Sequence, residues 1–141
     1  DFSEVSDRLV AKAIEMAATN GAELELAYVI YPPGEDYWGE AVGEVGEGGL
    51  SYVERVRKQA QQGMDQCLVG FTEQLKDVKY SSTILESTVP SVALTCHIQD
   101  TGADLVVLGT RGHSKLASIF VGTNAERLMH DATVSALAVR V

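Results

Sequence analysis

The sequence predicts a single-domain α/β fold over residues 1–141, and two observations lead to this prediction. Segments with apolar residues at helical spacing alternate along the chain with short apolar runs typical of strands that are buried on both faces. The run that ends before Gly109 leads through a glycine-rich loop directly into another helical segment. Strands that alternate with helices in this way predict parallel βαβ units with helices on the faces of one sheet.

The first half of the chain contains two predicted helices and one predicted strand. Residues 3–21 form the first helix, with Ser3 as its N-cap and Asn20-Gly21 as its C-cap. Residues 22–30 follow as a strand, and residues 51–76 predict one long amphipathic helix. The apolar residues of the two helices are Val5, Leu9, Ala13, Ile14 and Ala17, then Val53, Val56, Ala60, Met64, Cys67, Phe71 and Leu75.

The segment Gly34–Gly49, between this strand and the long helix, is acidic and rich in glycine, and it contains Tyr37 and the only tryptophan, Trp38. A loop of this length is usually functional or disordered. One interpretation is a mobile excursion whose aromatic pair folds onto the domain. The other is a lid over a bound base, or a surface for an unknown protein partner.

The second half predicts strand, helix, strand, helix and strand. These elements cover residues 78–87, 89–102, 104–108, 124–130 and 136–141. Pro90 suits the first turn of a helix, where its missing N–H costs nothing, and Gly102 suits the helix end. His97 has no second metal ligand one turn later, so we interpret it as a surface or satisfied histidine.

Composition excludes several classes of protein. The net charge of -9, without a cluster of lysine and arginine, argues against a nucleic-acid surface. No apolar run approaches the roughly 20 residues that a membrane span needs, and no signal peptide is visible, so we expect a cytoplasmic protein. Cys67 and Cys96 fall on predicted helices and are expected to be reduced core residues.

The segment Gly109–Asn124 is predicted to hold an anion, most simply phosphate. Gly109 and Gly112 allow a sharp turn and a close approach of the backbone to a ligand. Gly122 and Thr123 lie where the next helix begins, and free N–H groups at a helix N-terminus bind anions. Two other interpretations remain: the glycines allow tight packing of loop on helix, and Arg111 is a solvated charge.

The spacing Gly-x2-Gly-x9-Gly-Thr resembles the nucleotide-binding signature of the universal stress protein family, in its ATP-binding branch. It is neither a Walker A loop nor a Gly-x-Gly-x-x-Gly fingerprint. The resemblance covers essentially the whole chain, and it implies a three-layer sandwich around a five-stranded parallel sheet of order 3-2-1-4-5. The chain departs from the family pattern at residues 133–136 and 88–90, where the family commonly has Cys-Pro and Gly-x-Pro pairs.

The first strand of that sheet has no counterpart in the sequence. Family members begin with an apolar strand that ends in the aspartate of an Asp-x-Ser-x-x-Ser pattern, which Asp1, Ser3 and Ser6 match. We therefore expect residues upstream of Asp1. The alternative is a chain completed by strand exchange with a partner.

The resemblance implies that the ligand is ATP, with Mg²⁺ as a further candidate. The ligand would bind at the carboxyl ends of the strands, at the point where the strand order reverses. Asp1 would hold the adenosine end, and the backbone of Val29 would meet the adenine edge. The residues that would line the phosphates are Gly109, Arg111, Gly112, Val121, Gly122, Thr123 and Asn124.

Three functions follow, and the family resemblance favours the first. This is a regulatory switch in the stress response, in which ATP occupancy biases dimerisation or partner contact. The second is a dimeric scaffold that works without nucleotide, and the third is a nucleotide-hydrolysing or nucleotidyl-transfer enzyme. No Asp, Glu or Gln within Gly109–Asn124 offers a catalytic base, so any ATPase activity should be slow. The last strand, Ala136–Val141, predicts an antiparallel homodimer through its edge.

Overall fold

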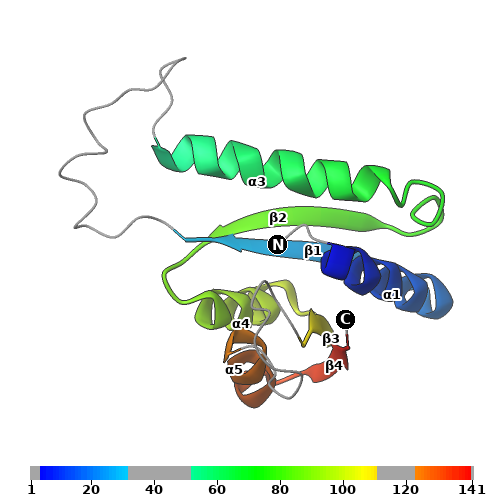
Figure 1. Cartoon of the computed structure of the whole chain (residues 1–141). Coiled ribbons are helices and arrows are strands. Elements are labelled where there is room, and N and C mark those ends of the chain that lie inside the picture. The colour runs from blue at the N-terminus through cyan, green and yellow to red at the C-terminus, as the bar shows by residue number, and fades with distance from the viewer. Residues whose placement is uncertain (1–3, 32–51, 111–122, 141) are drawn as a thin grey trace.

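The computed structural model describes residues 4–31, 52–110 and 123–140 (Figure 1). Helices and strands alternate along these residues, as the sequence predicts. In chain order the elements are α1 (Glu4–Asn20), β1 (Leu24–Ile30), α3 (Tyr52–Val69), β2 (Tyr80–Glu86), α4 (Pro90–Thr101), β3 (Leu105–Gly109), α5 (Thr123–Asp131) and β4 (Ser135–Val139). The acidic loop Gly34–Gly49, with Tyr37 and Trp38, lies outside the described residues.

The four strands form two parallel pairs. β1 pairs with β2 from Leu24 opposite Tyr80 to Ile30 opposite Glu86. β3 pairs with β4 from Leu105 opposite Ser135 to Gly109 opposite Val139. Within the described ranges no ladder joins the two pairs. The observed neighbours correspond to the pairs 3-2 and 4-5 of the predicted order 3-2-1-4-5, and the central strand of that order stays a prediction.

Helices cover both faces of the β1–β2 pair, which gives the layered α/β arrangement that the sequence predicts (Figure 1). α1 and α3 lie on one face, where their apolar side chains pack against those of the two strands. This first core cluster contains Ile14, Ala17, Met64, Leu68, Leu75 and Val78, with Leu24, Leu26, Tyr28 and Ile84 packed against it. α4 lies against the other face, where His97 bonds to Glu25 of β1. The strands are therefore fixed from two sides.

A second, smaller cluster joins α4 and α5 to the β3–β4 pair. Ile98, Leu108 and Leu128 are its buried members, and they come from α4, β3 and α5 respectively. Leu128 is only 3% exposed, so α5 is held in place by a side chain in its middle. This packing sets the position of the N-terminus of α5 relative to the end of β3.

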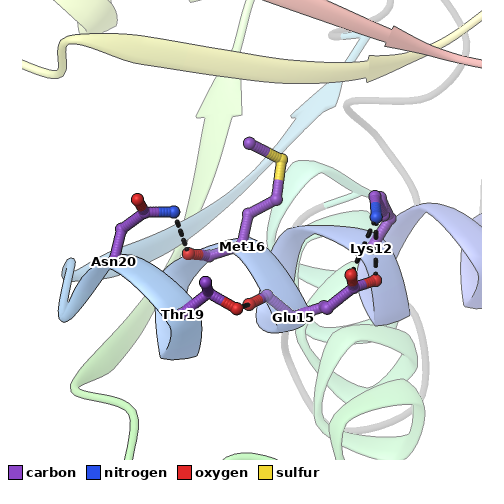
Figure 2. Close-up of polar contacts among 5 residues, drawn as sticks. All are labelled: Lys12, Glu15, Met16, Thr19 and Asn20. Atoms are coloured by element: carbon purple, nitrogen blue, oxygen red, sulfur yellow. Dashed lines mark hydrogen bonds and ion pairs between the residues drawn. The ribbon is translucent and has the colours of Figure 1, made fainter.

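The two predicted helix C-caps are confirmed. Gly21 has φ 60° and Gly102 has φ 69°, the left-handed conformation that glycine adopts without a steric penalty. In the last turn of α1, Asn20 Nδ2 donates to the Met16 carbonyl and Thr19 Oγ1 donates to the Glu15 carbonyl, each at 2.8 Å (Figure 2). One turn earlier, Lys12 and Glu15 form an exposed ion pair at 2.9 Å (Figure 2).

Two expectations about helices were wrong. The long helix ends at Val69 rather than near Lys76, because the chain turns at Gly70 and continues as a series of turns over residues 70–77. These turns carry Leu75, which is buried in the first cluster. Cys96 is exposed rather than in the core, because it lies between Leu94 and Ile98, whose side chains define the packed face of α4.

Candidate nucleotide site

The carboxyl end of β3 is one side of the candidate site. Hydrogen bonds to β4 fix the position of this strand end. Gly109 is the last residue of β3 and lies opposite Val139 in the ladder. The N–H of Thr110, the next residue, donates to the Val139 carbonyl at 3.0 Å. The chain thus leaves the strand from a fixed point, and from there the predicted loop begins.

The N-terminus of α5 is the second side. Thr123 is the first residue of this helix and Asn124 the second, and both are exposed. Residue 125 packs against the second core cluster, so this end of the helix is anchored immediately after its two exposed residues. Unpaired N–H groups of a first turn, together with the helix dipole, suit an anion.

One charge at this helix was missed in the sequence. Glu126 lies in the first turn of α5 and is exposed. A carboxylate here interacts favourably with the helix dipole, and for the same reason it competes with an anionic ligand. Because Glu126 follows Thr123 by three residues, the sequence alone places its carboxylate in the first turn of the predicted helix.

The carboxyl end of β1 is the third predicted side. Val29 is half-buried, and Ile30, the last residue of β1, is buried. The Ile30 carbonyl accepts the N–H of Ser87 at 3.1 Å, so the ladder with β2 extends one residue past the strands. The Val29 backbone therefore lies beside a strand end that the ladder with β2 holds.

A charged pair lies beside this strand end, and the sequence did not predict it. Glu86, the last residue of β2, lies opposite Ile30 in the ladder. Arg57 of α3 bonds to it through Nη2 and through Nε, the latter at 3.1 Å from Oε1. The guanidinium offsets a negative charge at the edge where an anionic ligand is expected.

The other predicted site residues lie outside the described part of the chain. These are Asp1, Arg111, Gly112, Val121 and Gly122. The structure thus places Gly109 and Thr123 on elements that share the second core cluster, and Val29 on the other strand pair. No group of three or more side chains that could hold a metal ion occurs within residues 4–31, 52–110 and 123–140.

Among the titratable side chains of the described residues, two have shifted pKa values, and both lie away from Gly109, Thr123 and Val29. Burial, with a further effect of the nearby Asp7 carboxylate, raises the pKa of the Cys67 thiol. The hydrogen bond from the His130 ring to Asp131, and the negative charge of Asp131, raise the pKa of His130. His130 is at the C-terminal end of α5, opposite the end that would hold phosphate.

The sequence profile of the universal stress protein family matches residues 1–140. Because the match covers almost the whole chain, this protein belongs to that family. A universal stress protein of Thermus aquaticus, from the 3' region of the QAH/OAS sulfhydrylase, is 29% identical over 141 residues. That alignment covers 99% of this chain and 93% of the relative.

Solved structures confirm the fold. The universal stress protein UspA from Lactobacillus plantarum matches with a TM-score of 0.78 at 17% identity, over 99% of this chain and 92% of that one. A universal stress protein in complex with cAMP matches with a TM-score of 0.64 at 20% identity, over 99% and 90%. A universal stress protein from Archaeoglobus fulgidus in complex with dAMP matches with a TM-score of 0.64 at 13% identity, over 96% and 88%.

Among the helices that the structure describes, none has the length and apolar character needed to cross a membrane.

Proposed function

We propose that this protein binds an adenine nucleotide, ATP in particular, and acts as a dimeric regulatory switch in the stress response. The observation that carries the proposal is that β3 and α5 belong to one hydrophobic cluster, which Ile98 of α4 completes. β3 ends at Gly109, α5 begins at Thr123, and Leu108 and Leu128 of these elements share one buried cluster. A strand end and a helix N-terminus held together in this way suit a phosphate chain. The cAMP and dAMP complexes of two structural neighbours add support.

The nucleotide would lie along the carboxyl ends of the strands. The backbone of Val29 would meet the adenine edge and Asp1 the adenosine end. The residues that would line the phosphates are Gly109, Arg111, Gly112, Val121, Gly122, Thr123 and Asn124. Mg²⁺ would accompany the phosphates if ATP is bound as its magnesium complex.

The proposed switch hydrolyses ATP slowly at most. Hydrolysis requires a base or metal that positions water, in addition to groups that stabilise the phosphate charge. The segment Gly109–Asn124 contains stabilising groups but no Asp, Glu or Gln. Turnover at rates typical of a dedicated nucleotide hydrolase would favour the enzyme hypothesis instead.

The test is direct chemical identification of the bound ligand. Purified protein is denatured, and the supernatant is separated by chromatography against adenine and guanine nucleotide standards. We expect ATP or another adenine nucleotide, and a thermal shift with millimolar ATP, since ligand at a hundredfold excess over Kd stabilises by about 2.7 kcal/mol. The Gly122→Val variant, checked for folding by circular dichroism, should lose both. No adenine nucleotide and no shift in the parent protein would contradict the proposal.

Dimerisation through β4 is the second part of the proposal. In the described residues β4 pairs only with β3, so its other edge offers main-chain groups to a second copy. An antiparallel homodimer through residues 136–141 would use this edge. Gel filtration with light scattering should give twice the chain mass. The Thr110 N–H donates to the Val139 carbonyl, so alternate residues such as Ala138 present their N–H to the outer edge, and Ala138→Pro, which removes one of these N–H groups, should favour the monomer. A monomeric parent protein at micromolar concentration would rule the dimer out.

A further inference from the structure

Three of the six exposed large apolar side chains of the described residues lie where β1 ends and α4 begins. Tyr31, the residue after β1, is 62% exposed, and Val89 and Val92 at the start of α4 are 39% and 55% exposed. We call these three residues the apolar end patch. The other three lie at the opposite end of the strands, where α3 ends and where β2 and β3 begin: Val69, Tyr80 and Leu105. Exposed apolar side chains that cluster at one place mark binding surfaces, whereas scattered ones are ordinary.

Hydrogen bonds between three segments bring the apolar end patch together. The N–H of Ser87, the residue after β2, donates to the Ile30 carbonyl at 3.1 Å. Ser87 Oγ in turn accepts the Val89 N–H at 3.0 Å. In Figure 1 the end of β1 and the start of α4 lie on the same side of the molecule. Tyr31 and Val89 therefore lie one and two residues from groups that meet at Ser87.

The apolar end patch lies on the face of the β1–β2 pair that α4 covers. Side chains alternate between the two faces of a strand. In β1, Tyr28 packs against the first core cluster on the side of α1 and α3, whereas Glu25 bonds to His97 of α4. The alternation from Glu25 gives Val29 the α4 side, and Tyr31 follows two residues later on the same side.

The sequence keeps Tyr31 in line with the strand. Pro32 follows it, and a residue before proline favours an extended backbone. Tyr31 is thus about 6.6 Å beyond Val29 along an extended chain. The ladder also turns the Val29 backbone away from β2, because the residues on either side of it, such as Ile30, are the ones that bond to β2.

The occupant that fits the apolar end patch is the base of the proposed nucleotide. A base that meets the Val29 backbone with its edge leaves its two faces uncovered, and an aromatic ring further along the same side can cover one of them. None of the three side chains of the patch is charged. The Arg57–Glu86 pair lies on the α3 side of the sheet, so it does not compete for a neutral ring.

We propose that Tyr31 is the base-stacking residue of the nucleotide site, and that Val89 and Val92 extend the apolar surface around the adenine. This inference rests on the proposed nucleotide binding and adds the side chains that hold the base. Stacking on an aromatic ring accepts any base, so the Tyr31 ring supplies affinity, and selection of adenine is left to the groups at its edge.

The experiment measures binding of ATP and of tripolyphosphate, which lacks the base and the sugar, by calorimetry and by NMR of the aromatic side chains. Loss of one stack in Tyr31→Ala should weaken ATP binding about five- to hundredfold and leave tripolyphosphate binding unchanged. Tyr31→Phe keeps the ring and should bind ATP within about twofold of the parent protein. The matched control is Tyr80→Ala, which removes a 48% exposed tyrosine at the other end of the strands and should not alter binding.

The NMR spectrum gives a readout that a structural role of Tyr31 would not produce. The Tyr31 ring signals, identified by their loss in Tyr31→Ala, should move upfield with ATP, because a stacked base shields them, and should stay in place with tripolyphosphate. ATP binding by the parent protein with unmoved Tyr31 signals, or with equal affinity in Tyr31→Ala, would overturn this inference and leave the proposed function standing. A parent protein that does not bind ATP would overturn both.

Discussion

His97 Nε2 lies 2.9 Å from Glu25 Oε1, so that a side chain of α4 is bonded to a side chain of β1. Both side chains are partly buried, at 21% and 33% exposed. The bond joins the face of the β1–β2 pair to the helix that also packs against α5. This one polar contact therefore links the β1–β2 pair to α4, the helix that shares the second core cluster with β3 and α5.

We expect His97→Ala to lower the free energy of unfolding by about 0.5–1.5 kcal/mol, the usual contribution of one hydrogen bond between partly buried groups. Glu25→Gln keeps an acceptor at the same position and should cost less. The control is Lys12→Ala, which breaks an exposed ion pair within α1 and should cost about 0.5 kcal/mol or less. Urea unfolding measures all three, and equal losses for His97→Ala and Lys12→Ala would show that the bond to β1 adds nothing.

The second prediction concerns Glu126 in the first turn of α5. Removal of its negative charge by Glu126→Gln should tighten ATP binding about two- to fivefold, which corresponds to about 0.3–1 kcal/mol for one charge at a helix N-terminus. Isothermal titration calorimetry measures the affinity. Glu73→Gln, an exposed glutamate on the turns after α3, is the control and should leave Kd unchanged. Unaltered or weaker binding by Glu126→Gln would place the phosphates away from this helix.

The third prediction concerns the two free thiols. Cys96 is exposed, whereas Cys67 is half-buried and its Sγ lies 3.7 Å from Asp7 Oδ1. Burial and the Asp7 carboxylate raise the pKa of Cys67, so less of it is thiolate, the reactive form, at neutral pH. In Ellman's assay the Cys67→Ser variant should therefore react faster than Cys96→Ser. Addition of Asp7→Asn to Cys96→Ser should speed the remaining thiol, and no change would show that burial alone protects it.

The fourth prediction concerns His130, whose ring nitrogen Nδ1 lies 2.8 Å from Asp131 Oδ1. The hydrogen bond to Asp131 raises the pKa of His130 in the folded state. The protonated ring therefore favours folding below the unfolded pKa of about 6.5, and this contribution is lost as pH rises through the raised value. NMR titration should give a lower midpoint for His130 in Asp131→Asn than in the parent protein. Identical midpoints would show that the pair does not form in solution.

Much of the local structure could be predicted from the sequence because it depends on neighbouring residues. Gly21 and Gly102 end helices in the left-handed conformation, and Pro90 begins one, as their residue types favour. Most strand ends in the structure differ from the predicted ends by one or two residues. The end of α3 was misplaced because Phe71 and Leu75 continue its apolar spacing, although Gly70 already turns the chain.

Contacts between distant segments could not be predicted in the same way. The bond between His97 and Glu25 and the pair of Arg57 with Glu86 depend on how helices pack on strands. For the candidate site, the positions of Gly109 at a strand end and Thr123 at a helix start were predicted correctly. Glu126 was not predicted as part of the site, because a carboxylate repels phosphate and does not belong to a phosphate-binding pattern.

The most direct test of the central claim is an NMR titration of ¹⁵N-labelled protein with ATP, followed through backbone amide signals. Nucleotide at the proposed site should shift the amides of Gly109, Thr110, Thr123 and Asn124 in a saturable manner, and leave those at the opposite strand ends, such as Leu24 and Tyr80, unchanged. Saturable shifts confined to other residues, or no saturable shift at millimolar ATP, would contradict the account.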